Sequence, residues 1–297
     1  MTDKKQLLGM AAALSANMIF GFSFLFSKLA LSAAHPLLIL AVRFTVAFLT
    51  LNILVLCRVV KINFKGKNLG KLLLMSIAQP FLYFIFELYG LSLTSSALSG
   101  IIISLVPIGV ILLSTAFLGE KPTAIQVVCT VVSIAGVCAV SLLSNDNSKN
   151  HIFGIALIVL AAITASVFNI LSRSESKKFS PFERTYFMFL VGAIGFNTIA
   201  LFVLKKDYFS SLATAAVNPD FIISILYLAV LSSVIAFLMY NYSTTVISAV
   251  RAASFSNIIT VVSLLAGMFI LKEEFSPLQA IICVPIILGV WGVNKAN

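Results

Sequence analysis

The chain alternates between long apolar segments and short polar connections. Two examples are the uncharged runs at 101–118 and 252–271. A helix rises about 1.5 Å per residue and the hydrocarbon core is about 30 Å thick, so a run of about 20 apolar residues can cross a bilayer. Polar residues, prolines and glycines divide the chain into ten predicted membrane-spanning helices. These are 7–30, 36–57, 71–93, 95–118, 123–144, 152–173, 181–204, 220–243, 247–271 and 277–294.

Composition excludes the other broad classes of protein. Of 297 residues, 60% are hydrophobic and only 10% are charged, whereas soluble domains have roughly 25% charged residues. A soluble or disordered chain is therefore excluded. An outer-membrane barrel would alternate apolar and polar residues in segments of about ten, and this chain does not. The pattern predicts a multi-pass helical protein of the cell membrane. The first run is long enough to be a retained helix, so we do not interpret it as a cleaved signal.

The basic residues indicate how the chain enters the membrane. With the N-terminus in the cytoplasm, 14 Lys and Arg fall on the inside and five on the outside, and Arg43 lies within the second span. Inner loops of membrane proteins are rich in Lys and Arg, so we expect both termini to be cytoplasmic. The net charge of +10 is then an orientation signal, and we expect no nucleic-acid partner.

Two halves of the chain match each other at fixed offsets. An offset of 153 residues aligns Phe84 with Phe237, Tyr89 with Tyr242, Leu118 with Leu271, Glu120 with Glu273 and Gly136 with Gly289. Nearer the start of each half an offset of 145 aligns Gly9 with Gly154, Ser27 with Ser172, Lys28 with Arg173, Pro36 with Pro181 and Phe44 with Phe189. The difference of eight predicts a longer loop around 205–219 in the second half.

This duplication predicts the fold and the domain organisation. Each half holds five spans, and five is an odd number, so the second half must enter the membrane the opposite way up. We therefore expect an all-α integral membrane fold of ten transmembrane helices as two inverted five-helix repeats, 7–144 and 152–294. Many secondary transporters have this architecture and bind substrate near the midplane between the repeats.

Several motifs give the pattern a family resemblance. They are Asn17-(x)3-Gly21-(x)6-Lys28 in the first span, Arg43-Phe44 in the second and Leu118-Gly119-Glu120 after the fourth. With the helix count and the repeat, they resemble the drug/metabolite transporter (DMT) superfamily, and within it the EamA-type transporters. The resemblance implies transport of small molecules across the cytoplasmic membrane, often export of amino acids or similar metabolites. The chain departs from the family pattern at Thr260, where a proline is expected, and at Leu271-Lys272-Glu273, which lacks the glycine.

Glu87 is the only acidic residue well inside a predicted span. Ser76, Gln79, Tyr83, Glu87 and Gly90 follow helical spacing and form one polar stripe. A polar stripe is costly against lipid and should face the bundle interior. Two interpretations of Glu87 stay open. It either recognises a cationic group or carries a proton in a cavity, or it is a structural carboxylate held by a neighbouring Tyr or Arg.

Two arginines also allow alternatives. Arg43 either binds a substrate carboxylate through its guanidinium or anchors the second span with its head near the outer interface. Arg251, nearer the end of a span, is predicted to be interfacial. Glu120 and Glu273 lie just before predicted helices, where a carboxylate complements a helix N-terminus, so we expect capping there.

Polar residues in other spans complete the candidate site. Asn17, Asn169 and Asn257 are costly to bury, so they either line a cavity or join helices, and Tyr240 is the repeat counterpart of Glu87. Serines in such helices more often serve close packing. The candidate substrate-binding residues are Asn17, Arg43, Tyr83, Glu87, Asn169, Tyr240 and Asn257, with Glu87 also the candidate for proton coupling.

The sequence therefore predicts a secondary transporter working by alternating access, and the family resemblance favours export of an amino acid or similar small polar metabolite. Expected partners are the substrate, the lipid bilayer and protons, and the internal repeat favours a monomer. The four cysteines and His35 and His151 form no metal-ligand spacing, so we expect neither metal nor cofactor. The alternatives are an integral-membrane enzyme, disfavoured by the lack of a catalytic constellation, and a facilitative channel.

Overall fold

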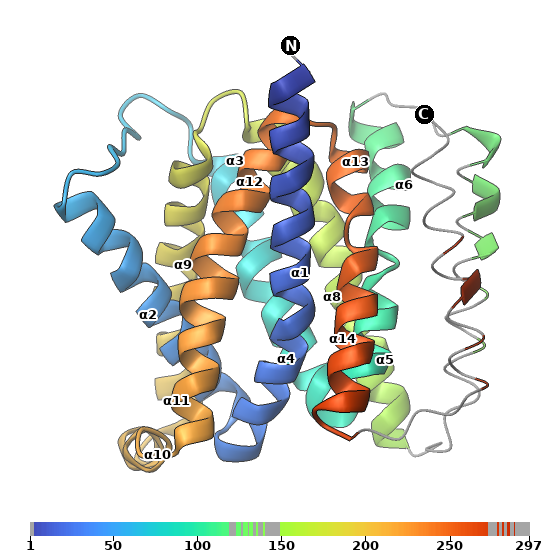
Figure 1. The fold of residues 1–297 in the computed structure, drawn as a ribbon. Coiled ribbons are helices and arrows are strands. Elements are labelled where there is room, and N and C mark those ends of the chain that lie inside the picture. Colours follow the sequence, from blue (N-terminus) through green and yellow to red (C-terminus); the bar gives the residue numbers. More distant parts are fainter. Residues whose placement is uncertain are drawn as a thin grey trace.

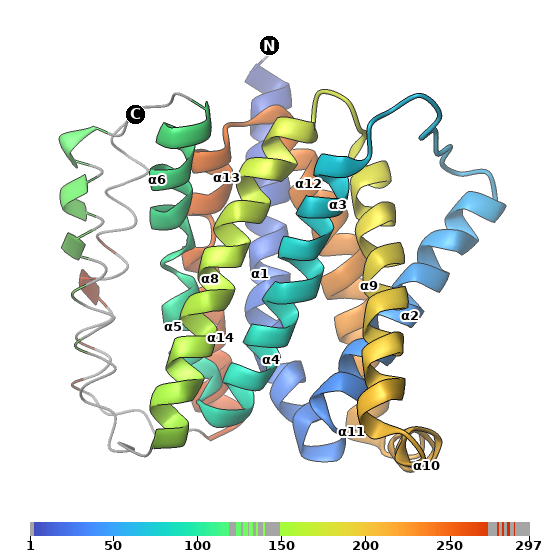
Figure 2. The same ribbon diagram turned by 180° about the vertical axis from the view of Figure 1, so that it is seen from behind.

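The computed structural model describes residues 3–118 and 149–272, with short stretches between 123 and 139 and scattered positions between 278 and 288. All regular structure in these residues is helical (Figures 1 and 2). The first half contains α1 (Asp3–Ala33), α2 (Pro36–Leu56), α3 (Gly70–Ser76), η1 (Ile77–Leu82), α4 (Tyr83–Leu93), α5 (Ser96–Ile103) and α6 (Val106–Leu118). The second contains α8 (Lys149–Glu175), α9 (Pro181–Leu204), α10 (Asp207–Ala215), α11 (Pro219–Leu226), η2 (Tyr227–Ala236), α12 (Phe237–Val246), α13 (Ala249–Ser254) and α14 (Asn257–Phe269).

Within the described residues, eight helical segments are long and apolar enough to cross a membrane. They are Lys4–Ala33, Pro36–Leu56, Gly70–Leu93, Ser96–Phe117, His151–Glu175, Pro181–Leu204, Pro219–Val246 and Ala249–Phe269. These segments match eight of the predicted spans to within a few residues. The other two predicted spans, 123–144 and 277–294, lie largely outside the described residues, as do Glu120 and Glu273. The protein is therefore a multi-pass helical membrane protein.

Local sequence explains where several spans begin. The side chains of His35, Ser180 and Asn218 each accept a hydrogen bond from the first turn of the helix that follows, and each is followed by proline. A side-chain acceptor satisfies a free backbone N–H of the first turn, and proline suits that turn because its missing N–H is not needed there. Ser180 also forms a reciprocal capping box with Glu183.

Two spans in each half are interrupted at matching places. The third span contains the π-helical segment η1, and its counterpart in the second half contains η2. Within η1, Gln79 has φ −150° and ψ 120°, outside the helical region, and Pro80 follows it. The fourth span breaks between α5 and α6, and its counterpart breaks between α13 and α14. Irregular backbone at membrane depth occurs where it is buried in protein or lines a cavity, so these breaks indicate where a site lies.

The helices pack in pairs drawn from both halves. α2 lies along α9, α4 along α8, α12 along α1, and α5 along α14. α1 begins at the top of Figure 1 and α8 ends there, so these two helices run in opposite directions. Close approach depends on small residues, because a Cβ added to Gly90 would lie 2.6 Å from Cδ1 of Ile158 and 3.0 Å from the carbonyl oxygen of Gly154.

The outside of the bundle carries large apolar side chains. Phe202 is 76% exposed and Ile194 62% exposed, as expected for a surface covered by lipid rather than water. The connection between α9 and α11, predicted as a longer loop, holds the short helix α10. The hydroxyl of Tyr208 in α10 donates to Oδ1 of Asn197 in α9 at 2.9 Å, which fixes α10 against the bundle.

Candidate functional site

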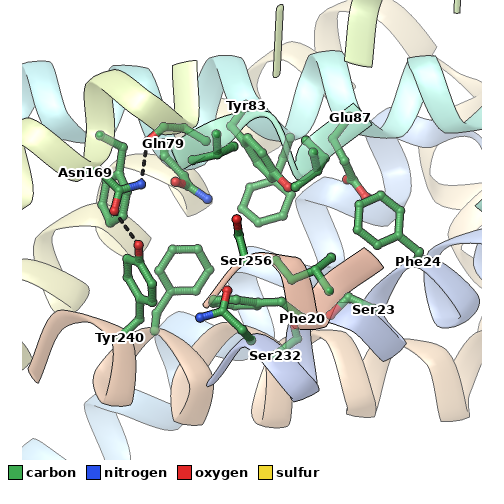
Figure 3. A pocket seen from close by; sticks show the side chains of 18 of the residues that line it. Phe20, Ser23, Phe24, Gln79, Tyr83, Glu87, Asn169, Ser232, Tyr240 and Ser256 are labelled. Atoms are coloured by element: carbon green, nitrogen blue, oxygen red, sulfur yellow. Dashed lines mark hydrogen bonds between the residues drawn. The ribbon is translucent and has the colours of Figure 1, made fainter. Parts of the chain in front are cut away.

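A cavity lies inside the bundle, and both halves of the chain contribute to its wall (Figure 3). Its empty space of about 620 Å³ includes the solvent at its opening. Its polar lining residues are Asn17, Ser23, Arg43, Gln79, Tyr83, Glu87, Asn169, Ser232, Tyr240 and Ser256. Its aromatic lining residues include Phe20, Phe24, Phe84, Phe168 and Phe237. An apolar wall with a few convergent polar groups is typical of sites for small molecules. All four interrupted spans reach this cavity, through Gln79 of η1, Val106 after the α5–α6 break, Ser232 of η2 and Ser256 between α13 and α14.

Glu87 lies in the cavity wall and is 3% exposed. In the described part of the protein its Oε2 has no hydrogen-bond partner. Figure 3 shows the carboxylate beside the ring of Phe24. A buried carboxylate without donors is costly, so this group requires a proton or a cation from the cavity.

Arg43 lies in the same cavity wall and is 2% exposed. Its Nε donates to Oγ of Ser233 at 3.0 Å and its Nη2 to Oγ of Ser232 at 3.1 Å. Its guanidinium lies 4.2 Å from the ring centroid of Phe84. The alternative that places its head near the outer interface is therefore wrong, because helix–helix packing encloses the side chain. These neutral partners hold the guanidinium without neutralising its charge.

Arg43 and Glu87 do not neutralise each other by direct contact. In the described ranges one ion pair forms within 4.0 Å, between Lys67 and Glu183 in the loop before α3 and the start of α9. The cavity therefore presents one positive and one negative group that are not in contact. Such a site can hold a molecule that carries both charges.

The side-chain amides of Asn17 and Asn169 each donate a hydrogen bond to a backbone carbonyl of their own helix. Nδ2 of Asn17 donates to the carbonyl of Ala13 at 2.7 Å, and Nδ2 of Asn169 to that of Ala165 at 2.8 Å. The hydroxyl of Tyr240 donates to Oδ1 of Asn169 (Figure 3). One side of each amide is thus structural, and the Asn169–Tyr240 pair links α8 to α12 across the cavity wall.

The structure brings together six of the seven candidate site residues, namely Asn17, Arg43, Tyr83, Glu87, Asn169 and Tyr240. Asn257 begins α14, and its side chain lies outside the described part of the protein. The predicted stripe on the third span divides in two. Gln79, Tyr83 and Glu87 face the cavity, whereas Ser76 bonds back to the carbonyl of Leu72 and Gly90 packs against α8.

Sequence reasoning missed the serines that hold Arg43. Ser232 and Ser233 lie in η2 and are fully buried. The offset of 153 residues aligns them with Gln79 and Pro80, the position of the break in η1. That alignment is the signal in the sequence from which a role for the two serines could have been predicted. Arg251, predicted to be interfacial, is exposed in α13.

Another arginine is buried although it lies near a helix start. Arg184, one of the 14 basic residues assigned to the inner side and a member of the predicted span 181–204, lies in the first turns of α9 and is 0% exposed. Its guanidinium reaches acceptors on α8 and α12, which supply the hydrogen bonds that water would provide at a surface. Among the described residues, no group of three His, Cys, Asp or Glu could hold a metal ion.

A bundle of membrane-spanning helices around a cavity lined by Arg43 and Glu87 is an arrangement that suits a membrane transporter. The model of the EamA-like transporter family matches residues 7–142 and again residues 152–295. The chain therefore belongs to this family, which confirms the resemblance seen in its motifs.

Individual relatives agree with this assignment. The chain is 33% identical over 298 residues to the uncharacterized transporter YcxC of Bacillus subtilis, covering 99% of this chain and 95% of that protein. It is 28% identical over 257 residues to an uncharacterized transporter of Archaeoglobus fulgidus, covering 86% and 88%. A solved crystal structure shares the fold with a TM-score of 0.71 at 18% identity, covering 99% of this chain and 98% of that one.

Proposed function

We propose that the protein is a secondary transporter that exports a small zwitterionic metabolite, an amino acid or similar, across the cytoplasmic membrane. The observation that carries the proposal is the cavity in which Glu87 and Arg43 face the same space without pairing. Glu87 would receive the cationic group of the substrate, and the free edge of the Arg43 guanidinium its carboxylate. The surrounding aromatic rings would contact the remainder. The export direction rests on the family resemblance.

Alternating access would operate between two inverted five-helix halves, which makes ten spans in all. Three features of the described residues support this. α1 and α8 run in opposite directions (Figure 1). The breaks recur in matching spans. Packing recurs too, because Gly9 lies against Val246 and Ile247 as Gly154 lies against Leu93 and Thr94, and the offset of 153 aligns the two pairs of partners. Such duplication allows one arrangement to open in either direction.

Proton coupling would use Glu87. The carboxylate lacks a donor at Oε2, so a proton and a substrate cation are alternative ways to compensate the same charge. Competition of the two for one group is the simplest form of antiport, because the loaded carrier releases one when it takes up the other. The protein would act as a monomer, since the cavity is built within one chain, with both termini in the cytoplasm.

The test is transport in proteoliposomes that contain the purified protein. Vesicles preloaded with one unlabelled amino acid at a time should take up the labelled form transiently above equilibrium for the true substrate. This counterflow is expected of a carrier only, because a channel equilibrates without it and an enzyme leaves a changed molecule. Arg43→Gln should abolish counterflow of the zwitterion, whereas Arg251→Gln, at an exposed arginine, should leave it unchanged. A substrate that lacks the carboxylate and is carried equally well would contradict the role of Arg43.

A further inference from the structure

Two basic side chains hold helix ends at equivalent positions of the two halves. Nζ of Lys28 in α1 donates to the carbonyl oxygens of Leu91 at 2.9 Å and Thr94 at 2.5 Å, at the end of α4. Nη1 of Arg173 in α8 donates to the carbonyl oxygens at the end of α12, Thr244 at 2.8 Å and Thr245 at 3.2 Å. The last carbonyls of a helix lack partners within the helix and carry partial negative charge, so each basic residue fastens one helix to the end of another.

These two contacts lie on opposite sides of the cavity. Lys28 comes one helical turn after the lining residue Phe24, and Arg173 one turn after the lining residue Asn169. Because α1 and α8 run in opposite directions (Figure 1), the Arg173 contact lies at the end of the bundle where the N-terminus lies, and the Lys28 contact lies at the other end. Each contact therefore lies where the cavity would have to open.

The Arg173 end carries a larger polar cluster. Nη1 of the fully buried Arg184 donates to the carbonyl of Ser172 at 2.7 Å and to its hydroxyl at 2.6 Å. Nη2 donates to the carbonyl of Asn241 at 2.5 Å and to Oγ1 of Thr245 at 2.6 Å. Nη1 also reaches Oγ1 of Thr244 at 3.1 Å. One guanidinium thus joins α8, α9 and α12.

At the Lys28 end three of the five equivalent positions are apolar. The offsets of 145 and 153 align Arg184 with Ile39, Asn241 with Leu88, and Thr244 with Leu91, whereas Thr245 aligns with Ser92. Ser172 aligns with Ser27, which is fully buried and whose hydroxyl has no partner among the described residues. The two ends of the duplicated bundle therefore differ: Arg184 and Arg173 form a polar network at one, whereas Lys28 contacts a helix end among mostly apolar neighbours at the other.

We propose that Arg184, with Ser172, Asn241, Thr244 and Thr245, forms a hydratable gate at the N-terminal end of the cavity, whereas Lys28 and its apolar neighbours close the opposite end. Water can replace each partner of Nη1 and Nη2 when α12 separates from α8 and α9. Water can then also bond to Nε of Arg184, which is buried and has no partner among the described residues. Opening the other end instead exposes buried apolar side chains such as Ile39 and Leu88 to water. The inference rests on the proposed alternating access and adds the residues that control one of its two openings.

Directional labelling of a cysteine in the cavity tests the gate without any substrate. Ser256 is a suitable reporter position because it lines the cavity and its hydroxyl has no partner in the described part of the chain. The reporter is Ser256→Cys in the full-length protein, with its four native cysteines replaced. A membrane-impermeant thiol reagent is added to sealed vesicles from one side or the other, and the labelling rates are compared.

Arg184→Gln keeps a polar side chain that water can hydrate, but it removes the guanidinium whose hydrogen bonds join α8, α9 and α12. Labelling from the side of the N-terminus should rise roughly tenfold or more, equivalent to about 1.4 kcal/mol, with no rise from the opposite side. Lys28→Gln should increase labelling from the opposite side only. Arg251→Gln is the matched control, an exposed arginine in α13 near the same end as Arg184, and should change neither rate.

A milder variant keeps the gate testable if Arg184→Gln does not fold. Thr244→Val removes one hydroxyl partner of Arg184 and should increase labelling in the same direction by a smaller factor. Folded Arg184→Gln or Thr244→Val protein with unchanged labelling, or with equal increases from both sides, would overturn the gate. Labelling needs no substrate, so it tests the gate separately from transport. A side-specific change in labelling without measurable transport would support the gate and reject the proposed function. Transport without a side-specific change in labelling would support the proposed function and reject the gate.

Discussion

The guanidinium of Arg43 lies 4.2 Å from the ring centroid of Phe84. Phe84 is one helical turn before Glu87 on α4, so the ring that supports the positive group and the acidic residue belong to the same helix face. A cation over an aromatic ring is stabilised without losing its charge, unlike a cation paired with a carboxylate. This contact therefore keeps Arg43 in place while leaving it able to bind an anion.

The contribution of this contact can be measured. Phe84→Leu should raise the half-saturation constant for transport roughly 2- to 30-fold, because a cation–π contact contributes about 0.5–2 kcal/mol. Phe48→Leu is the control, since Phe48 packs against Tyr186 away from the cavity. In an Arg43→Lys background with measurable transport, the effect of Phe84→Leu should differ from that in the wild type. Identical effects in both backgrounds would show that Phe84 acts independently of Arg43.

Glu87→Gln should separate the two proposed roles of the carboxylate. Glutamine is close in shape but cannot carry a proton or a negative charge. If Glu87 carries only the coupled proton, the variant should retain counterflow but lose accumulation driven by a pH gradient, and its rate should no longer depend on pH. If Glu87 binds the substrate cation, alone or in competition with the proton as proposed, counterflow itself should fall. Asp207→Asn, at an exposed acid at the start of α10, should behave as wild type. A Glu87→Gln variant with unchanged flux and pH profile would leave the carboxylate a structural role only.

Amides of the candidate site should affect affinity, whereas serines that pack helices should not. Asn17→Ala and Asn257→Ala should each raise the half-saturation constant roughly 5- to 150-fold, because an unsatisfied buried group costs about 1–3 kcal/mol. Ser76→Ala is the control on the same stripe as Glu87, since its hydroxyl bonds to Leu72 outside the cavity. It should lower thermal stability more than affinity. Small, equal effects on affinity at all three positions would place the substrate elsewhere.

Topology can be mapped with reporter fusions. The bias of Lys and Arg predicts cytoplasmic signals after residues 65 and 178 and external signals after residues 149 and 206. The connection that contains Lys67 bonds to Glu183 at the start of α9, so positions 65 and 178 should report the same side. An external signal at 178 would reject the proposed orientation, and opposite signals at 65 and 178 would reject the pairing of these two connections.

Much of the fold follows from the sequence because its signals are local. Span length is set by the thickness of the bilayer, and helix starts at Pro36, Pro181 and Pro219 follow from capping residues beside proline. The cavity face of the third span is also local, since helical spacing places Tyr83 and Glu87 on one side of one helix. The repeat adds long-range information, because equal offsets align residues that occupy equivalent positions.

Tertiary structure alone decided which polar groups meet. Arg43 and Ser233 are 190 positions apart, and no spacing rule relates residues on different helices. The same limit applies to Arg184, which resembles a surface charge near a helix start until α8 and α12 enclose it with acceptors. The environment of a side chain depends on which helices pack together, and that is set by the shapes of whole helix faces, such as the close approach at Gly90 and Gly154. Sequence therefore determined the helices and the candidate groups, and packing determined the cavity and the two ends that close it.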